Sequence, residues 1–356
     1  MANHLTLAVA GSRKTQGIVE HCASLPTKRR ALVLTFTQTN QAELRERLSI
    51  YAGEKVNIQV MGWFTFLLRD FARPFLPFKF PKQRVKGFNF DGRPHLMAKG
   101  IKRFLDVNNT VYACELGRLA SELIEDSKGV LIHRLECIYD EILIDEVQDL
   151  SSHDWLIIDA LLNTSIDIRM VGDIRQSVLS TNPRSAKNKK YEYAEAIHWF
   201  REREKTGVLE IFENTTTWRC HSNIASFSDT IFNSDWQFPK TNSMNNIETE
   251  HDGVFLIRPE HIDDYVNKFS PKCLRHSASS GKAFDLDYTN FKVSKGGAFK
   301  RVLIVPTEGI IKFIQSGTFL GPVPAASFYV AVTRAEQSVV VVASDPGASV
   351  IPYWEP

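Results

Sequence analysis

Apolar and polar positions alternate along the chain in blocks that predict strands followed by helices. Short apolar runs at residues 5–10, 31–37 and 142–144 are typical of buried parallel strands. Patterns with helical spacing follow the first two runs. This alternation over residues 1–66 and about 138–205 predicts an α/β fold, with a parallel sheet covered by helices.

The interval 67–137 interrupts the alternation and predicts an inserted subdomain. Its first part is rich in Phe, Pro and Lys, and residues 96–126 have helical periodicity. A second sheet is expected to begin at residues 208–212. It continues through three further apolar runs, at 253–257, 301–305 and 338–343. The polar stretch 235–252 predicts a loop.

Two adjacent carboxylates, Asp145 and Glu146, directly follow the apolar run that ends at Ile144. Such a pair at the end of a buried strand is costly unless it binds a cation or moves a proton. In a phosphoryl-transfer site, the first would hold Mg²⁺ and the second would activate the attacking water. A strand that simply ends in solvated acids at a turn is the alternative.

A candidate phosphate-binding loop follows the first apolar run. Residues 8–15 align with the pattern G-x-x-x-x-G-K-[ST], so backbone N–H groups would cradle phosphates while Lys14 and Thr15 serve the phosphates and Mg²⁺. Ala8 replaces the first glycine of the pattern. Arg13 replaces the second, where it disfavours a positive φ but could add positive charge. The candidate nucleotide contacts in this loop are Gly11, Ser12, Arg13, Lys14 and Thr15.

The composition is that of a large globular protein rather than an obvious nucleic-acid binder. The 356 residues suggest two domains, 43% are apolar, and the net charge is only +2. Basic residues gather between Lys79 and Arg103 and lie among phenylalanines. Cations and aromatic faces together suit a single-stranded nucleic acid, although a Phe-rich core with a solvated basic face is the alternative.

The five cysteines are widely spaced and include no C-x-x-C pair, which indicates neither a zinc site nor a disulfide framework. A reducing, cytoplasmic compartment is therefore expected. No apolar stretch approaches membrane-spanning length, and the first apolar run is too short for a signal peptide.

Further motifs follow in a fixed order. They are Thr37-Gln38-Thr39-Asn40, Gly62-Trp63-Phe64-Thr65-Phe66, Gly172-Asp173-Ile174-Arg175-Gln176, Trp218-Arg219, Ser294-Lys295-Gly296-Gly297 and Val332-Thr333-Arg334. Together with the loop and the acidic pair, this ordered set resembles the UvrD/Rep/PcrA branch of superfamily 1 helicases. The resemblance covers roughly half of the chain.

The resemblance implies two RecA-like P-loop NTPase domains with ATP and Mg²⁺ between them. Residues 1–66 and 138–205 would form the first domain, 67–137 a small, mainly helical insertion, and 206–356 the second domain. By the same resemblance, Thr15 and Asp145 would hold Mg²⁺ and Glu146 would be the catalytic base.

The resemblance also assigns roles to residues outside the loop and the acidic pair. Gln176 would sense the γ-phosphate, and Arg219 and Arg334 would act as arginine fingers. The positions near a single strand would be Phe36, Thr37, Gln38, Trp63, Phe64, Ser294 and Lys295.

Several departures from the family pattern favour a minimal motor core. The upstream Gln-containing element that reads adenine is expected to be absent, and base-stacking aromatics are missing after Gln176, where Ser177, Val178 and Leu179 follow. Ala298 replaces a family Glu. The gap from Arg219 to Lys295 is too short for the large insertion of full-length relatives.

Three hypotheses follow. The first is an ATP-dependent helicase or translocase on single-stranded or tailed DNA, with 3′→5′ polarity implied only by the resemblance and RNA left open. The second is an ATP-gated, nucleic-acid-binding regulatory subunit that controls a nuclease or another repair or phage-defence partner. The third, motivated by Arg13 and Ala298, is a pseudo-ATPase scaffold. No membrane partner is expected.

Overall fold

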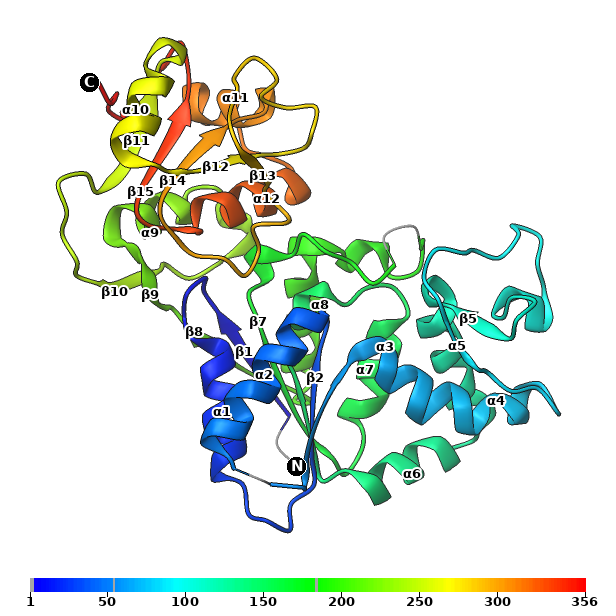
Figure 1. Cartoon of the computed structure of the whole chain (residues 1–356). Coiled ribbons are helices and arrows are strands. Elements are labelled where there is room, and N and C mark those ends of the chain that lie inside the picture. The colour runs from blue at the N-terminus through cyan, green and yellow to red at the C-terminus, as the bar shows by residue number, and fades with distance from the viewer. Residues whose placement is uncertain (1–2, 54, 183–184) are drawn as a thin grey trace.

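The computed structural model describes residues 3–53, 55–182 and 185–356 (Figure 1). The described chain contains two large parallel sheets, one of six strands and one of five, with helices packed on them. The predicted α/β class with two parallel sheets is therefore confirmed. Among the residues described, none of the helices has the length and apolar character needed to span a bilayer.

The six-stranded sheet has the order β3-β2-β6-β7-β1-β8, and all its pairings are parallel. Its strands are β1 (His4–Ala8), β2 (Ala31–Thr35), β3 (Ile58–Gly62), β6 (Glu141–Ile144), β7 (Asp167–Gly172) and β8 (Glu210–Asn214). Every residue of β2 and β6 is buried, as expected for strands covered on both faces. We call this sheet and the helices on it the first lobe.

One predicted strand belongs to a different sheet than expected. The run at 208–212 was predicted to open the second sheet, but β8 pairs in parallel with β1 at the edge of the first. Apolar periodicity locates a strand without indicating its neighbour, because pairing depends on how the chain returns through space. The domain boundary at residue 206 stays a prediction.

Helices cover both faces of the first sheet. They are α1 (Lys14–Ser24), α2 (Gln38–Tyr51), α7 (Asp154–Leu162) and α8 (Ala196–Lys205). Because side chains of a strand alternate between faces, Val33 of β2 packs with Val19 of α1 and Leu44 of α2, while Leu32 and Leu34 belong to the core on the opposite face. The two apolar layers hold the carboxyl ends of the strands at one edge.

The interval predicted to be an inserted subdomain begins within a continuous helical segment. This segment comprises α3 (Trp63–Phe66), a π-helical turn (Leu67–Ala72) and α4 (Arg73–Lys79). A two-stranded parallel sheet of β4 (Gly87–Asn89) and β5 (Thr110–Tyr112) follows, and then α5 (Ala113–Asp126) and α6 (Val130–Ile138). These helices lie to one side of the first sheet (Figure 1).

The helical pattern predicted over 96–126 is correct only in its second part. The predicted apolar face of α5, including Leu116 and Leu119, is buried. Residues 96–112 instead contain a 3₁₀ turn at Gly100–Arg103 and strand β5. Leu96 and Met97 are exposed, so these apolar positions do not form the buried side of a helix.

The five-stranded sheet has the order β11-β15-β14-β12-β13 and is also parallel. Its strands are β11 (Gly253–Ile257), β12 (Lys272–Arg275), β13 (Tyr288–Asn290), β14 (Phe299–Val305) and β15 (Ala335–Val342). Its helices are α9 (Ser222–Asp229), α10 (Ile262–Phe269), α11 (Glu308–Ser316) and α12 (Pro322–Val332). We call this sheet and its helices the second lobe. The three later runs predicted for it are strands, whereas the short β12 and β13 were not predicted.

A two-stranded sheet lies between the lobes. β9 (Thr216–His221) pairs in parallel with β10 (Asn242–Asn245), so the stretch 235–252 is not entirely a loop as predicted. The β9 backbone at Trp218 donates to the Gly11 carbonyl in the first lobe at 3.0 Å, and β9 also contacts β15. Residues 216–221 thus touch both lobes.

Candidate functional site

The loop between β1 and α1 packs closely against β9. Gly11 has a φ of 75°, and a Cβ built on it would lie 2.6 Å from Arg219 Cβ and 2.7 Å from Thr217 Oγ1. Only glycine combines this backbone conformation with this approach. Arg13 also takes a left-handed conformation, with φ 61° and ψ 31°.

The first two residues of α1 contact the acidic pair. Lys14 Nζ lies 3.3 Å from Glu146 Oε1, and Thr15 Oγ1 donates to Asp145 Oδ2 at 3.4 Å. β6 and β1 both pair in parallel with β7, which lies between them, so the carboxylates after β6 lie at the same edge of the sheet as the end of β1.

The two carboxylates differ in their electrostatic surroundings. Burial, followed by the charge of Glu146, raises the pKa of Asp145 above its usual range. Burial also disfavours ionisation of Glu146, but the Lys14 and Lys295 ammonium groups outweigh it and lower the pKa of Glu146. Glu146 is thus held as a carboxylate, and a Gln148 amide donates to it.

Thr15 and Asp145 suit a magnesium ion that is shared with a substrate. Mg²⁺ commonly takes one or two protein ligands and completes its shell with water and phosphate oxygens. The Thr15 hydroxyl and the Asp145 carboxylate are such a pair. Within the described ranges, no cluster of three or more His, Cys, Asp or Glu side chains forms a metal site supplied by the protein alone.

Lys295 reaches this site from the second lobe. Its Nζ lies 2.8 Å and 2.9 Å from the Asp149 carboxylate oxygens and 3.4 Å from Glu146 Oε2. Burial lowers the pKa of Lys295, but the Asp149 and Glu146 carboxylates outweigh it and the net pKa is raised. Lys295 therefore links the two lobes beside Glu146, and its place near a single strand stays a prediction. The preceding Ser294 is buried.

Two arginines approach the same site from β9 and from the end of α12. Arg219 donates to the Thr333 carbonyl at 3.1 Å. Arg334 is 1% exposed and donates to the Gln176 side chain and the Gly297 carbonyl, each at 3.0 Å. Burial, and then the proximity of Arg219, lower the pKa of Arg334 to about 10, so it remains a cation at neutral pH.

Gln176 extends this contact into the first lobe. Its amide donates to Asp173 at 2.8 Å, and Asp173 also accepts from the Tyr329 hydroxyl at 3.3 Å. The Tyr329 hydroxyl in turn accepts from the Ala10 N–H at 3.3 Å. A buried chain of hydrogen bonds therefore connects Arg334 to the backbone of the loop after β1.

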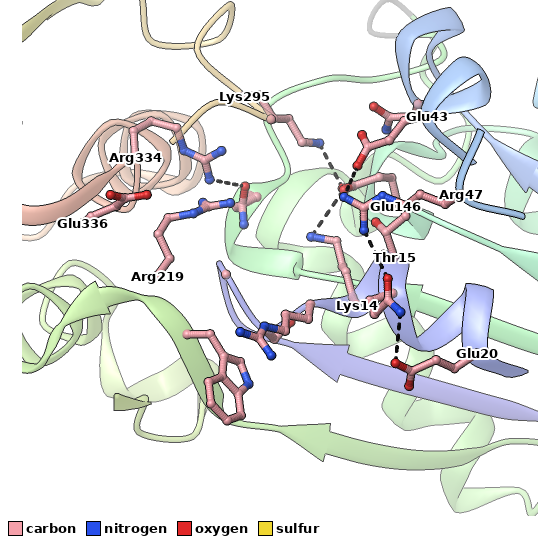
Figure 2. A pocket seen from close by; sticks show the side chains of 18 of the residues that line it. Lys14, Thr15, Glu20, Glu43, Arg47, Glu146, Arg219, Lys295, Arg334 and Glu336 are labelled. Atoms are coloured by element: carbon pink, nitrogen blue, oxygen red, sulfur yellow. Dashed lines mark hydrogen bonds and ion pairs between the residues drawn. The ribbon is translucent and has the colours of Figure 1, made fainter. Parts of the chain in front are cut away.

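One cavity of about 670 Å³ lies between the lobes (Figure 2), lined by Lys14, Thr15, Glu146, Gln176, Arg219, Lys295 and Arg334 but not by Asp145. Figure 2 shows Lys14 and Glu146 on one side of it and Arg219 and Arg334 on the other. Among the described lining residues, six are basic and four acidic, so the cavity suits a polyanion. The basic side chains are Arg13, Lys14, Arg47, Arg219, Lys295 and Arg334.

Part of the cavity lining was not predicted. Asn40, Glu43, Arg47 and Tyr51 line it from α2, and Trp218 lines it from β9. The α2 residues recur at spacings of three and four, which places them on one helix face, but this pattern does not reveal what that face meets. The sequence motif indicated Trp218 only as the neighbour of Arg219.

The predicted single-strand positions are distributed unevenly. Phe36 and Phe64 are half-buried with ring centres 6.0 Å apart, and Gln38 is exposed. Thr37 caps α2, accepting from the Asn40 N–H at 3.1 Å. Trp63 is 1% exposed and its indole N–H donates to Asp154. Its ring therefore cannot contact a nucleic-acid strand directly and can only support the residues above it.

The family model of the UvrD/REP helicase N-terminal domain matches residues 79–197, a third of the chain that includes Asp145, Glu146 and Gln176. The resemblance inferred from the motifs is thus confirmed. Residues 79–197 form a UvrD-like, helicase-like segment of the chain.

Solved structures of arterivirus nonstructural protein 10, a helicase, are also similar. The complex of that protein with DNA is 12% identical with a TM-score of 0.47, covering 96% of this chain and 61% of that one. A crystal structure of the same protein is 14% identical with a TM-score of 0.47, covering 96% and 59%. The chain spans about three fifths of the length of these helicases. No curated protein matches it in sequence.

Proposed function

We propose that this UvrD-like chain is a Mg²⁺- and ATP-dependent motor that moves on single-stranded or tailed DNA. The observation that carries the proposal is the cavity in which Lys14 and Glu146 of the first lobe face Arg219 and Arg334. The UvrD-like match supports ATP as the ligand and nucleic acid as the partner. Polarity from 3′ to 5′ rests on the resemblance alone.

The chemistry assigned to each side chain follows from its position. Magnesium, when bound, would neutralise phosphate charge and orient the terminal phosphate, with Thr15 and Asp145 as its protein ligands. Lys14 would contact the phosphates. Glu146, held ionised by neighbouring ammonium groups, would accept a proton from the attacking water.

The position of the arginines would couple turnover to the approach of the lobes. Arg219 and Arg334 would stabilise charge on the transferred phosphoryl group, a contribution typically worth about 10³–10⁵ in rate. Arg334 follows α12 of the second lobe, so its distance from Lys14 would change when the lobes move, whereas Arg219 lies on β9, which packs on the loop after β1. Gln176, which accepts from Arg334, would transmit that movement to the first lobe.

The test is ATP turnover with and without single-stranded DNA. Glu146→Gln removes the proposed base while keeping its size, so we expect stimulated turnover to fall about 10²–10⁴-fold. Glu260→Gln, on an exposed turn of the second lobe, is the matched control and should turn over ATP normally. Unchanged stimulated hydrolysis in Glu146→Gln would show that the assigned chemistry is wrong.

One observation favours the alternative of an ATP-gated regulatory subunit. Where relatives carry stacking aromatics after the Gln176 position, Val178 is buried against Ala326 and Val330 of α12, and Leu179 packs on this cluster. This segment therefore fills the lobe interface instead of offering rings to bases. Under this alternative, the purified chain would hydrolyse ATP without displacing a strand from 3′- or 5′-tailed duplexes. A partner such as a nuclease would carry out the reaction on the nucleic acid, under the control of this chain.

A further inference from the structure

Arg13 occupies an unusual backbone position at the edge of the cavity. It is the residue before α1 and has a left-handed conformation, which non-glycine residues adopt only under strain. The N-terminus of α1 has neither a side-chain cap nor an acidic residue in its first turn. Its free N–H groups and its dipole therefore favour an anion at this point, one residue from the Arg13 side chain.

The Arg13 guanidinium lies on an aromatic ring instead of a carboxylate. Its central carbon is 4.3 Å from the centre of the Trp218 ring on β9, and Trp218 is 45% exposed. Within the described part of the chain, Arg13 forms no ion pair, whereas the adjacent Lys14 pairs with Glu146. A cation–π contact at an exposed site is weak compared with charge-assisted hydrogen bonds between arginine and phosphate.

The two side chains lie at the junction of two hollows. Both line the 670 Å³ cavity, and both also line a neighbouring cavity of about 480 Å³ together with Gln16, His21 and Asn214. The Arg13 side chain can thus turn from the Trp218 ring towards the N-terminus of α1 and remain within these two cavities.

We propose that Arg13 is a phosphate-contacting residue that rests on Trp218 until a polyphosphate binds and then leaves the ring to bind it. This inference rests on the proposed function, because it requires the cavity to accept a nucleoside triphosphate. The planar fork of arginine matches phosphate oxygens, so the side chain compensates for the glycine that a phosphate loop normally has here. The move uncovers one face of Trp218.

The probe is inorganic tripolyphosphate with Mg²⁺, which presents the phosphates without a base. Binding is followed on the full chain by calorimetry and by tryptophan fluorescence. Because the chain has six tryptophans, the part of the signal lost in Trp218→Leu is assigned to Trp218. We expect a saturable change of that signal in the wild type.

Arg13→Ala should weaken tripolyphosphate binding about 10–100-fold and abolish the Trp218 signal. The matched control is Arg258→Ala, since Arg258 lies 4.5 Å over the Tyr353 ring outside the cavity lining. It should bind like the wild type. Trp218→Leu should bind tripolyphosphate about two- to fivefold more tightly, because Arg13 no longer has to leave a ring. A purely structural contact between Arg13 and Trp218 would not produce that gain.

The outcomes separate the two proposals. If the wild type binds neither ATP nor tripolyphosphate, the proposed function fails and this inference fails with it. If the wild type binds both and Arg13→Ala matches it, only this inference is overturned. If Arg13→Ala does not fold, Arg13→Asn tolerates the left-handed backbone without restoring the glycine of the phosphate-loop pattern, and it should show the same loss of binding. Tight binding by Arg13→Asn would overturn the inference.

Discussion

Single residues of the cavity are constrained mainly by the close approach of its loop to β9. Gly11 is held between Thr217 and Arg219, and its carbonyl accepts from the Trp218 N–H. A side chain here would have to displace β9, which also carries one of the proposed arginine fingers. Local geometry and proposed chemistry therefore depend on the same residue.

Gly11→Ala should lower both stability and ATP turnover. Its Cβ would clash with Arg219 Cβ, and its φ of 75° would strain any L-residue. We expect turnover to fall at least about tenfold, because misplacement of a catalytic group by about 1 Å has such effects. ATP hydrolysis and thermal unfolding are the measurements.

The control for this change is Gly17→Ala. Gly17 lies in α1, and a Cβ there would meet nothing within 4 Å. Alanine should stabilise the chain by roughly 0.5–1 kcal/mol, because glycine is a poor helix former. If Gly11→Ala and Gly17→Ala have the same ATP turnover and thermal stability, the close packing of the loop on β9 is not required for activity or stability.

Helices of the first lobe are tied together by a buried carboxylate. Asp154, in the first turn of α7, accepts from Trp63 Nε1 at 3.0 Å, from the Ser151 N–H at 3.3 Å and from the Thr181 hydroxyl. Burial raises the pKa of Asp154 to about 6. This contact joins α3, α7 and the segment after Gln176, which explains why Trp63 faces the core.

The raised pKa of Asp154 predicts a pH-dependent stability. Between about pH 4 and pH 6 the folded state holds a proton that the unfolded state has released, so the free energy of unfolding should fall as pH rises. A shift of two pKa units corresponds to about 3 kcal/mol. Asp154→Asn keeps an acceptor for Trp63 but cannot ionise.

Denaturant unfolding at pH 4 and pH 7 gives the free energy of unfolding of the wild type and of Asp154→Asn. The effect is the change with pH in the difference between these two free energies. The variant should gain stability relative to the wild type as pH rises. A constant difference across this range would show that folding does not raise the pKa of Asp154.

At the level of the whole molecule, the cavity exists only because two lobes meet. Lys295 joins the second lobe to Glu146 and Asp149, and Arg334 joins it to Gln176. These interlobe contacts lie at the proposed catalytic centre itself. Separation of the lobes would therefore remove positive charge from the site as well as open it.

Arg219→Ala tests this dependence, because Arg219 is only half-buried and its loss should be tolerated by the fold. We expect nucleotide affinity to change by a few-fold, while turnover falls about 10³-fold, since the interaction would be made mainly in the transition state. Separate determination of KM and kcat distinguishes the two effects.

Arg201→Ala, on α8 and outside the cavity lining, is the matched control. It should leave KM and kcat unchanged. A rise in KM at constant kcat in Arg219→Ala would indicate that Arg219 only binds the ligand.

Local sequence indicated most of the longer strands of the two large sheets, the candidate phosphate loop and the acidic pair. Alternating or continuous apolar runs encode burial directly, and Gly11, Lys14, Asp145 and Glu146 lie within a few residues of such strands. The order of the motifs was enough to reveal the UvrD-like resemblance. These features depend on short-range spacing, which is readable from the chain.

Tertiary structure alone decided which strands pair and what faces the cavity. Apolar periodicity could not show that β8 pairs with β1, nor that Lys295 crosses to Asp149. The burial of Trp63 depends on Asp154, 91 residues later. Contacts between residues far apart in sequence depend on how the layers pack in three dimensions, and no local pattern encodes that packing.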